Sequence, residues 1–164
     1  MKIFKIRKGF HSSLHPIKLH KNKKAISFDV SFNPNCRYDL ESNDQYDINK
    51  LYGISWGYHM KNSFRIGWNW DSLRDHINLW SYTHNNGVIE AEYIDFVPTD
   101  YILKIDVFFN REKNNITIKW LNQEKTIAFK FPENKWGYYL WPYFGGNRRS
   151  PHTITIKLKE NEIH

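Results

Sequence analysis

Two neighbouring segments in the first half of the chain alternate large apolar residues with small or polar ones. In residues 52–59, and again in residues 63–70, aromatic and branched side chains occupy the even positions. This period of two is typical of a β-strand with one buried face. We expect the two strands to form a hairpin with one face in the core, while the opposite face carries His59, Arg65 and Asn69.

A third strand is expected over residues 77–84, just before Asn86-Gly87, a pair typical of tight hairpin turns. If one parity of this strand joins the core, the other parity extends the polar face with Trp80, Tyr82 and His84. The opposite orientation of this strand also stays open, with Trp80 in the core and Ile77 and Leu79 facing outward.

Further segments of the same kind follow along the chain, separated by turn residues. They are residues 26–32, 88–96, 101–109, 115–121, 126–131, 138–144 and 153–159. No long helical pattern, internal repeat or Gly/Ser-rich linker interrupts them. The pattern predicts an all-β fold, an antiparallel β-sandwich of about ten to twelve strands. We expect a single domain over residues 1–164, in which residues 1–24 form a basic N-terminal strand or loop segment.

The most specific stretch is residues 140–156, LWPYFGGNRRSPHTITI. Gly145-Gly146 are expected to reverse the chain with positive φ, a conformation that glycine adopts easily. Pro151 then restarts an extended segment, which continues as the alternating closing strand.

This ending resembles the C-terminal strand pair of jelly-roll proteins with the concanavalin A-like lectin/glucanase architecture. The resemblance rests on Pro-Tyr-Phe-Gly-Gly at residues 142–146, followed by Pro151-His152. Residues 47–54 and 62–68 are similar to the central strands of uncharacterised bacterial and phage proteins that share the ending. The resemblance implies a jelly-roll fold. The matching residues Tyr143, Gly145, Gly146 and His152 are expected to be structural, with the His152 imidazole bonded to backbone so that it holds the turn.

Composition and charge narrow the class of partner. Aromatic residues make up 17% of the chain, which favours sheet-on-sheet packing over helix bundles. The chain carries 24 Lys and Arg against 17 Asp and Glu, a formal net charge of +7, which suggests nucleic acid or an acidic polymer. The lysines gather near the N-terminus instead of interleaving with aromatic residues on one strand face, as base stacking requires. Nucleic acid is therefore disfavoured.

The chain lacks cysteine pairs, a visible signal peptide and a long apolar run, and these absences bear on its expected cellular location. Cys36 is the only cysteine, so no disulfide forms within the chain, and a buried structural thiol is favoured over a nucleophile. No signal peptide is visible, and no run of ~18 apolar residues suggests a membrane span. We expect a cytoplasmic or virion-associated protein with no membrane partner.

The predicted polar face has the chemistry of a sugar-binding surface. A sugar stacks its apolar face on an aromatic ring, while its hydroxyl groups need directional hydrogen bonds. The candidate ligand-binding residues are His59, Arg65, Asn69, Trp80, Tyr82 and His84.

Two catalytic chemistries have candidate residues. Concanavalin-like glucanases place two acidic residues at alternate positions of one strand, to flank the same glycosidic bond. Glu90-Ala91-Glu92 has this spacing, but the Tyr-Ile-Asp that follows departs from the glucanase motif Glu-x-Asp-x-x-Glu. A polysaccharide lyase needs an Arg to neutralise a uronate carboxylate, and Tyr or His to move protons. Arg65, His59, Tyr82 and His84 supply these types, but no catalytic residue is assigned and the sequence leans toward a non-enzyme.

Metal binding has two weak candidates. His11, His15 and His20 are close in sequence but lie around Pro16, without the helical spacing that would bring them together. A set of oxygen donors without a standard loop signature makes calcium a weak candidate: Asp39, Asp44, Asp47 and Asn49. We assign no metal ligand and no cofactor.

The sequence thus favours a non-catalytic module that binds a glycan or acidic polysaccharide. The alternative is a structural or protein-interaction component, such as a phage-encoded virion protein, with another protein as its partner. A lyase-like enzyme is the third interpretation.

Overall fold

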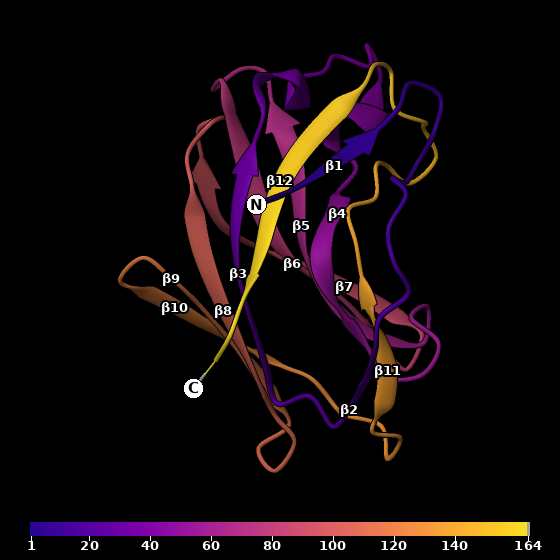
Figure 1. Ribbon diagram of the computed structural model, residues 1–164, viewed down its shortest axis with the longest axis vertical. Coiled ribbons are helices and arrows are strands. Elements are labelled where there is room, and N and C mark those ends of the chain that lie inside the picture. Colours follow the sequence, from indigo (N-terminus) through magenta and orange to yellow (C-terminus); the bar gives the residue numbers. More distant parts are fainter. Residues whose placement is uncertain (164) are drawn as a thin grey trace.

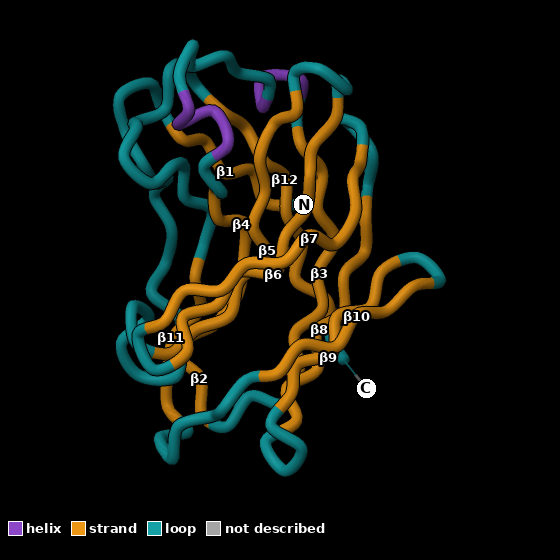
Figure 2. The backbone as a smooth tube through the Cα atoms, turned by 180° about the vertical axis from the view of Figure 1, so that it is seen from behind, coloured by secondary structure: helices purple, strands orange, loops and turns teal. Residues whose placement is uncertain are grey.

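In the computed structural model, which describes residues 1–163, two antiparallel six-stranded sheets pack into a jelly-roll β-sandwich. The first sheet consists, in spatial order, of β1 (Lys2–Ile6), β12 (Ile154–Asn161), β3 (Ala25–Phe32), β8 (Leu103–Asn110), β9 (Asn115–Trp120) and β10 (Gln123–Ala128). The second consists of β2 (Leu19–Lys21), β11 (Trp136–Leu140), β4 (Asn49–Ser55), β5 (Asn62–Asp71), β6 (His76–Asn85) and β7 (Val88–Val97). Figure 1 and Figure 2 show the two layers from opposite sides. The all-β sandwich predicted from the alternation is confirmed.

The core lies between the sheets and is rich in aromatic side chains. Phe32 on β3 packs against Trp68 on β5, with 5.3 Å between the ring centres. Phe28 and Tyr52 make a second contact between the sheets, at 4.9 Å. The period-two pattern turns the even positions of β5 toward the first sheet, where they are buried, and the odd positions from Ser63 to Asn69 are buried on the opposite face.

The N-terminal residues contribute an edge strand to each sheet. β1 pairs with β12 in the first sheet, and β2 pairs with β11 in the second. In the described residues, no helix is long and apolar enough to cross a membrane.

The hairpin between β6 and β7 turns at the expected residues. Asn86 and Gly87 have φ values of 51° and 82°. Two successive positive φ values match the right-handed twist of a tight hairpin, and an Asn-Gly pair tolerates them.

The C-terminal turn differs from the expectation in one residue. Gly145 has a φ of 81°, and an added Cβ would lie 2.2 Å from the Arg148 carbonyl oxygen, so this position requires glycine. Gly146 is not among the glycines with positive φ, so the prediction of positive φ for both was wrong. The turn is fixed by the Gly145 N–H, which donates to Asn49 Oδ1 at 2.6 Å.

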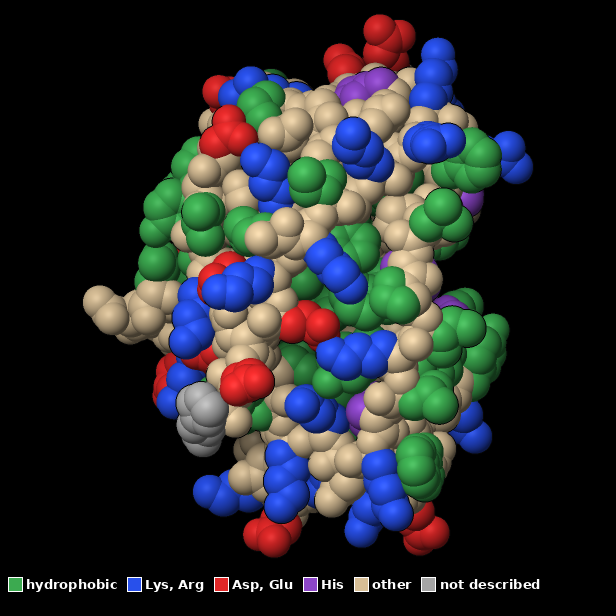
Figure 3. Space-filling view, in the orientation of Figure 1, with side chains coloured by type: hydrophobic (Ala, Val, Ile, Leu, Met, Phe, Trp, Pro, Cys, Tyr) green, Lys and Arg blue, Asp and Glu red, His purple; other side chains and the backbone are tan. Residues whose placement is uncertain are grey.

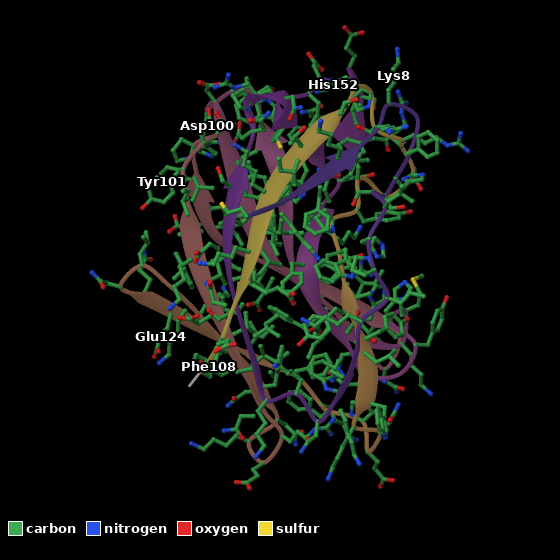
Figure 4. All side chains as sticks on the ribbon, in the orientation of Figure 1. Lys8, Asp100, Tyr101, Phe108, Glu124 and His152 are labelled. Carbon is green, nitrogen blue, oxygen red and sulfur yellow. The ribbon has the colours of Figure 1, made fainter. Side chains whose placement is uncertain are left out.

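His152 bonds to backbone as expected, but at a different segment. Its Nε2 lies 2.7 Å from the Asn35 carbonyl oxygen, next to the short 3-10 helix Pro34–Cys36. Figure 4 labels His152 at the end of the sandwich that also holds Lys8 and Asp100. His152 therefore ties the start of β12 to the loop after β3.

The strand predicted over residues 52–59 ends early. β4 stops at Ser55, and Gly57 has a φ of 73°, which breaks the alternation. Tyr58 is consequently 65% exposed and not in the core, a correction to the pattern. His59 follows in the loop that leads to β5, so it approaches the polar face from a loop and not from a strand.

Candidate functional site

The outward-facing side of the second sheet, called here the outer face, gathers most of the polar candidates. Strand register places Arg65 on β5 between Gly53 on β4 and Tyr82 on β6. A Cβ at Gly53 would lie 1.9 Å from the Phe64 carbonyl oxygen, so this glycine is required by the close approach of the two backbones. On the adjacent rungs, Ser63 is opposite His84 and Gly67 is opposite Trp80.

Arg65 is a buried cation with no ion-pair partner among residues 1–163. Arg65 is only 7% exposed, and its Nε has no hydrogen-bond partner among the described residues. Among the described residues, no carboxylate forms an ion pair with it. Burial lowers the pKa of Arg65, partly offset by the nearby hydroxyl groups of Tyr82, Tyr138 and Tyr143. An uncompensated buried charge is costly, which makes Arg65 a candidate functional residue.

His59 is held beside this cation by Tyr138. The His59 backbone N–H donates to Tyr138 Oη at 3.1 Å, and the same oxygen lies 2.8 Å from the imidazole Nδ1. The Ser63 hydroxyl donates to the His59 carbonyl at 2.7 Å. Burial, followed by the positive charge of Arg65, lowers the pKa of His59, which favours a neutral imidazole.

His84 lies on the other side of Ser63. It is 4% exposed, its Nδ1 lies 3.5 Å from the Ser63 hydroxyl, and its Nε2 has no partner. Burial is the largest influence that lowers the pKa of His84, and the charge of Arg65 is the next. The outer face therefore holds two neutral imidazoles and an unpaired guanidinium.

Lys50 adds a second cation that sequence reasoning missed. Its Nζ donates to the Gly145 carbonyl at 3.2 Å and lies 4.7 Å from the centre of the Tyr82 ring. Burial, followed by Arg65, lowers the pKa of Lys50 to about 8. A register shift between Lys50 and Tyr52 turns this lysine outward, whereas unbroken alternation would place it in the core.

The outer face also gains tyrosines from the C-terminal part of the chain. Tyr138 on β11 contacts His59, and Tyr143 pairs through its backbone with Lys50, at 2.8 and 2.9 Å. His11 stacks on the Tyr143 ring at 5.1 Å. We call the following group the Arg65 cluster: Lys50, His59, Arg65, Tyr82, His84 and Tyr138.

Asn69 and Trp80 lie on the same face but satisfy each other. Trp80 Nε1 donates to Asn69 Oδ1 at 3.2 Å, and Asn69 Nδ2 donates to the Tyr46 carbonyl at 3.2 Å. Ile77 and Leu79 are buried in the core, so the assignment that placed Trp80 there does not describe this strand. This pair borders the Arg65 cluster and is rigid, since its polar atoms are bonded within the protein.

The acidic residues of β7 do not join this site. Glu90 and Glu92 pair with the inward parity of β6, opposite Thr83 and Ser81, and Glu92 forms an ion pair with Lys125 at 3.3 Å. Asp95 accepts a hydrogen bond from Trp120 Nε1 at 2.8 Å. These contacts favour structural roles for the acids.

The metal candidates do not converge within the described residues. There, no three His, Cys, Asp or Glu side chains gather in a way that could hold a metal ion. His20 bonds to the Ser55 carbonyl at 2.7 Å, while His15 lies beside Trp141. Asp39 accepts the Glu41 N–H in a turn. Cys36 is fully buried, which raises the pKa of its thiol.

A cavity of about 590 Å³ opens elsewhere, at the mouth between the two sheets. Three of its polar groups are paired with one another: Lys18 Nζ lies 2.7 Å from Glu160 Oε1, which also accepts the Tyr52 hydroxyl. Figure 3 looks onto this side and shows an acidic side chain surrounded by basic ones. Lys18 and Glu160 already neutralise each other in this hollow, whereas Arg65 has no ion-pair partner among the described residues, so the outer face is the stronger candidate.

Comparison with known proteins supports the fold. No protein-family model matches the chain, and no curated protein sequence does. Among solved structures, the alginate lyase AlyC3 is similar over 97% of this chain and 74% of its own, with a TM-score of 0.65 and 12% identity. Its complex with dimannuronate is similar over 99% and 75%, at the same TM-score and 10% identity. The family 18 polysaccharide lyase aly-SJ02 is similar over 97% and 87%, with a TM-score of 0.53 and 5% identity. At these identities the likeness shows a shared fold.

Proposed function

We propose that the outer face binds an acidic polysaccharide, with Arg65 as the group that recognises a sugar carboxylate. The observation that carries this proposal is the buried guanidinium with no counterion among the described residues. A carboxylate accepts a guanidinium through paired, charge-assisted hydrogen bonds, which would offset the cost of burying Arg65.

The neighbours of Arg65 fit a sugar ring that bears this carboxylate. Tyr82 offers an aromatic face, and Lys50 lies over that ring as a second cation. His84 lies beside Arg65 on this face, and its buried Nε2 has no hydrogen-bond partner among the described residues. The formal net charge of +7 favours an acidic polymer over a neutral one.

The comparisons add support from the ligand of a protein with the same fold. AlyC3 has been solved with dimannuronate, an acidic disaccharide. This makes uronate polymers the first ligands to test on this chain, while the low identity leaves the sugar to be established by experiment.

The experiment is a glycan array that includes neutral, sulfated and uronate polymers, read with and without calcium. Selective binding to uronate polymers supports the proposal, and binding lost on removal of calcium would add a metal to the site. Exclusive binding to neutral glycans, or no binding at all, contradicts it. If the protein binds no glycan at all, self-assembly or a co-purifying protein would support the structural alternative.

A second candidate function, β-elimination of a uronate polymer, is favoured by the pairing of Tyr138 with His59. In this reaction a base removes the proton next to the carboxylate, a double bond forms in the ring, and the bond to the leaving oxygen breaks as that oxygen gains a proton. Arg65 would neutralise the carboxylate, while His59 and Tyr138, 2.8 Å apart, are a base and an acid within reach of each other.

The two functions differ in their product. Incubation with polymannuronate, followed by ultraviolet absorbance of the new double bond, detects elimination. Absorbance that rises with wild-type protein and not with Tyr138→Phe supports a lyase. Binding without any rise supports a non-catalytic module.

A further inference from the structure

We propose that the bound acidic chain continues from Arg65 across Tyr138 to Trp136, where a distal sugar ring stacks on the indole and Lys21 pairs with its carboxylate. This rests on the function proposed above and extends it to a ligand several rings long. Trp136 and Lys21 were not among the residues that the sequence suggested for the site.

Trp136 is placed on the outer face by strand alternation. It lies two residues before Tyr138 on β11, and Tyr138 reaches the Arg65 cluster through His59. The intervening Gly137 is buried opposite His20, on the other side of the sheet. Trp136 is 55% exposed, an unusual state for a side chain of this size, which generally gains stability by burial.

Lys21 completes a platform with this indole. It is the register partner of Trp136 on β2, and its Nζ lies 5.2 Å from the centre of the ring. An exposed aromatic plate beside a free ammonium group matches the two features of a uronate ring, an apolar face and a carboxylate.

The platform lies farther from Arg65 than a disaccharide extends. Arg65 pairs with Gly53, which pairs with Leu140, so two strand spacings separate β5 from β11. Trp136 lies four residues before Leu140 along β11. Spacings of about 4.8 Å between strands and about 3.3 Å per residue give a backbone separation of roughly 16 Å.

The distribution of charged residues favours one direction for the bound polysaccharide as it leaves the Arg65 cluster. Beyond Trp136, exposed lysines follow in Lys23, Lys24 and Lys135, and the Asn22 N–H bonds to the Lys135 carbonyl. The opposite edge, β7, places Ile89, Ala91 and Tyr93 beside the outward residues of β6, and none of the three is basic.

The test compares two exposed aromatic residues at opposite edges of the outer face. Trp136→Ala removes the platform, and Phe96→Ala on β7 is the matched control, since Phe96 is 53% exposed. Binding of dimannuronate and of hexamannuronate is measured by calorimetry for both variants, for wild type and for Arg65→Gln. Thermal melting first establishes that each variant is folded.

We expect Trp136→Ala to weaken hexamannuronate binding about threefold to tenfold, as the loss of one aromatic contact implies, and to leave dimannuronate binding unchanged. Phe96→Ala should alter neither, and Lys21→Gln should reduce the salt dependence of hexamannuronate binding. Arg65→Gln should weaken both ligands.

Each outcome bears on a separate claim. Full hexamannuronate affinity in Trp136→Ala, or a loss confined to Phe96→Ala, overturns the path to Trp136 while the role of Arg65 stands. Unchanged affinity in Arg65→Gln contradicts the proposed function instead. Wild-type protein that binds neither ligand contradicts both.

Discussion

Lys50 Nζ lies 4.7 Å from the centre of the Tyr82 ring, and the pKa of Lys50 is lowered to about 8 by burial and by Arg65. The two cations therefore share one small region of the outer face, and the nearby Asp47 carboxylate only partly offsets the lowering of the Lys50 pKa. Under the proposed function, this arrangement costs the free protein stability and is relieved when the ligand carboxylate binds.

Ligand binding should weaken as pH rises through about 8, because Lys50 then loses the charge that attracts the carboxylate. Affinity for oligomannuronate, measured by calorimetry between pH 7 and pH 9, should fall in wild type and stay flat in Lys50→Gln. An equal decline in both proteins would show that another group titrates.

The free energy of unfolding should change in the opposite direction. Between about 8 and the ordinary lysine value of 10.5, the unfolded chain holds a proton that the folded chain has released. Rising pH therefore favours the folded state. Over this range, chemical denaturation should show wild type gaining stability relative to Lys50→Gln, and a relative loss would refute the low pKa.

Replacing Arg65 with Met should stabilise the free protein by about 1 to 4 kcal/mol, because an uncompensated buried charge is removed and the volume is retained. Urea denaturation without ligand measures the change. Arg111→Met is the matched control and should destabilise, since Arg111 donates to the Pro132 and Asn134 carbonyls at 2.6 and 3.0 Å. A destabilised Arg65→Met would indicate that this arginine serves the fold.

His84 should make stability decline on the acid side. Its pKa in the folded state is lowered from 6.5, so below that value the unfolded chain takes up a proton first and unfolding is favoured. Stability measured from pH 7.5 to pH 5.5 should fall less in His84→Asn than in wild type. Identical slopes would mean that His84 is protonated as easily in the folded state.

Asn49 should be the most sensitive residue of the C-terminal turn. It is 1% exposed, donates to the Tyr38 hydroxyl at 2.9 Å and accepts the Gly145 N–H at 2.6 Å. Asn49→Ala leaves the Gly145 N–H unsatisfied, while the Tyr38 hydroxyl still accepts from the Trp70 N–H at 3.3 Å, so we expect a loss of about 1 to 3 kcal/mol. The exposed Asn122→Ala should change stability by less than about 0.5 kcal/mol. Similarly small losses of stability in Asn49→Ala and Asn122→Ala would contradict a structural role for the hydrogen bonds of Asn49.

The fold could be predicted from local alternation because β5 and β6 follow a strict period of two. Arg65, Tyr82 and His84 were placed on one face by the same argument. The pattern failed where the backbone departs from regular geometry. The positive φ of Gly57 ended β4, and the register shift after Lys50 turned that lysine outward.

The remaining parts of the site depend on contacts between distant segments. Tyr138 is 79 residues from His59 in the sequence. Tyr143 pairs with Lys50 through its backbone, and no local sequence pattern predicts this pairing. The missing counterion of Arg65 is likewise a property of the packed structure, since the sequence offers 17 acidic residues and the fold places none of those described in an ion pair with it.

The most direct test of the central claim is calorimetric titration of wild type and Arg65→Gln with hexamannuronate and with the same oligosaccharide after reduction of its carboxyl groups. We predict that wild type binds the acidic form and loses most of this affinity for the reduced form, while Arg65→Gln binds both weakly and alike. Equal binding of the acidic and reduced forms by wild type would contradict recognition of a carboxylate by Arg65.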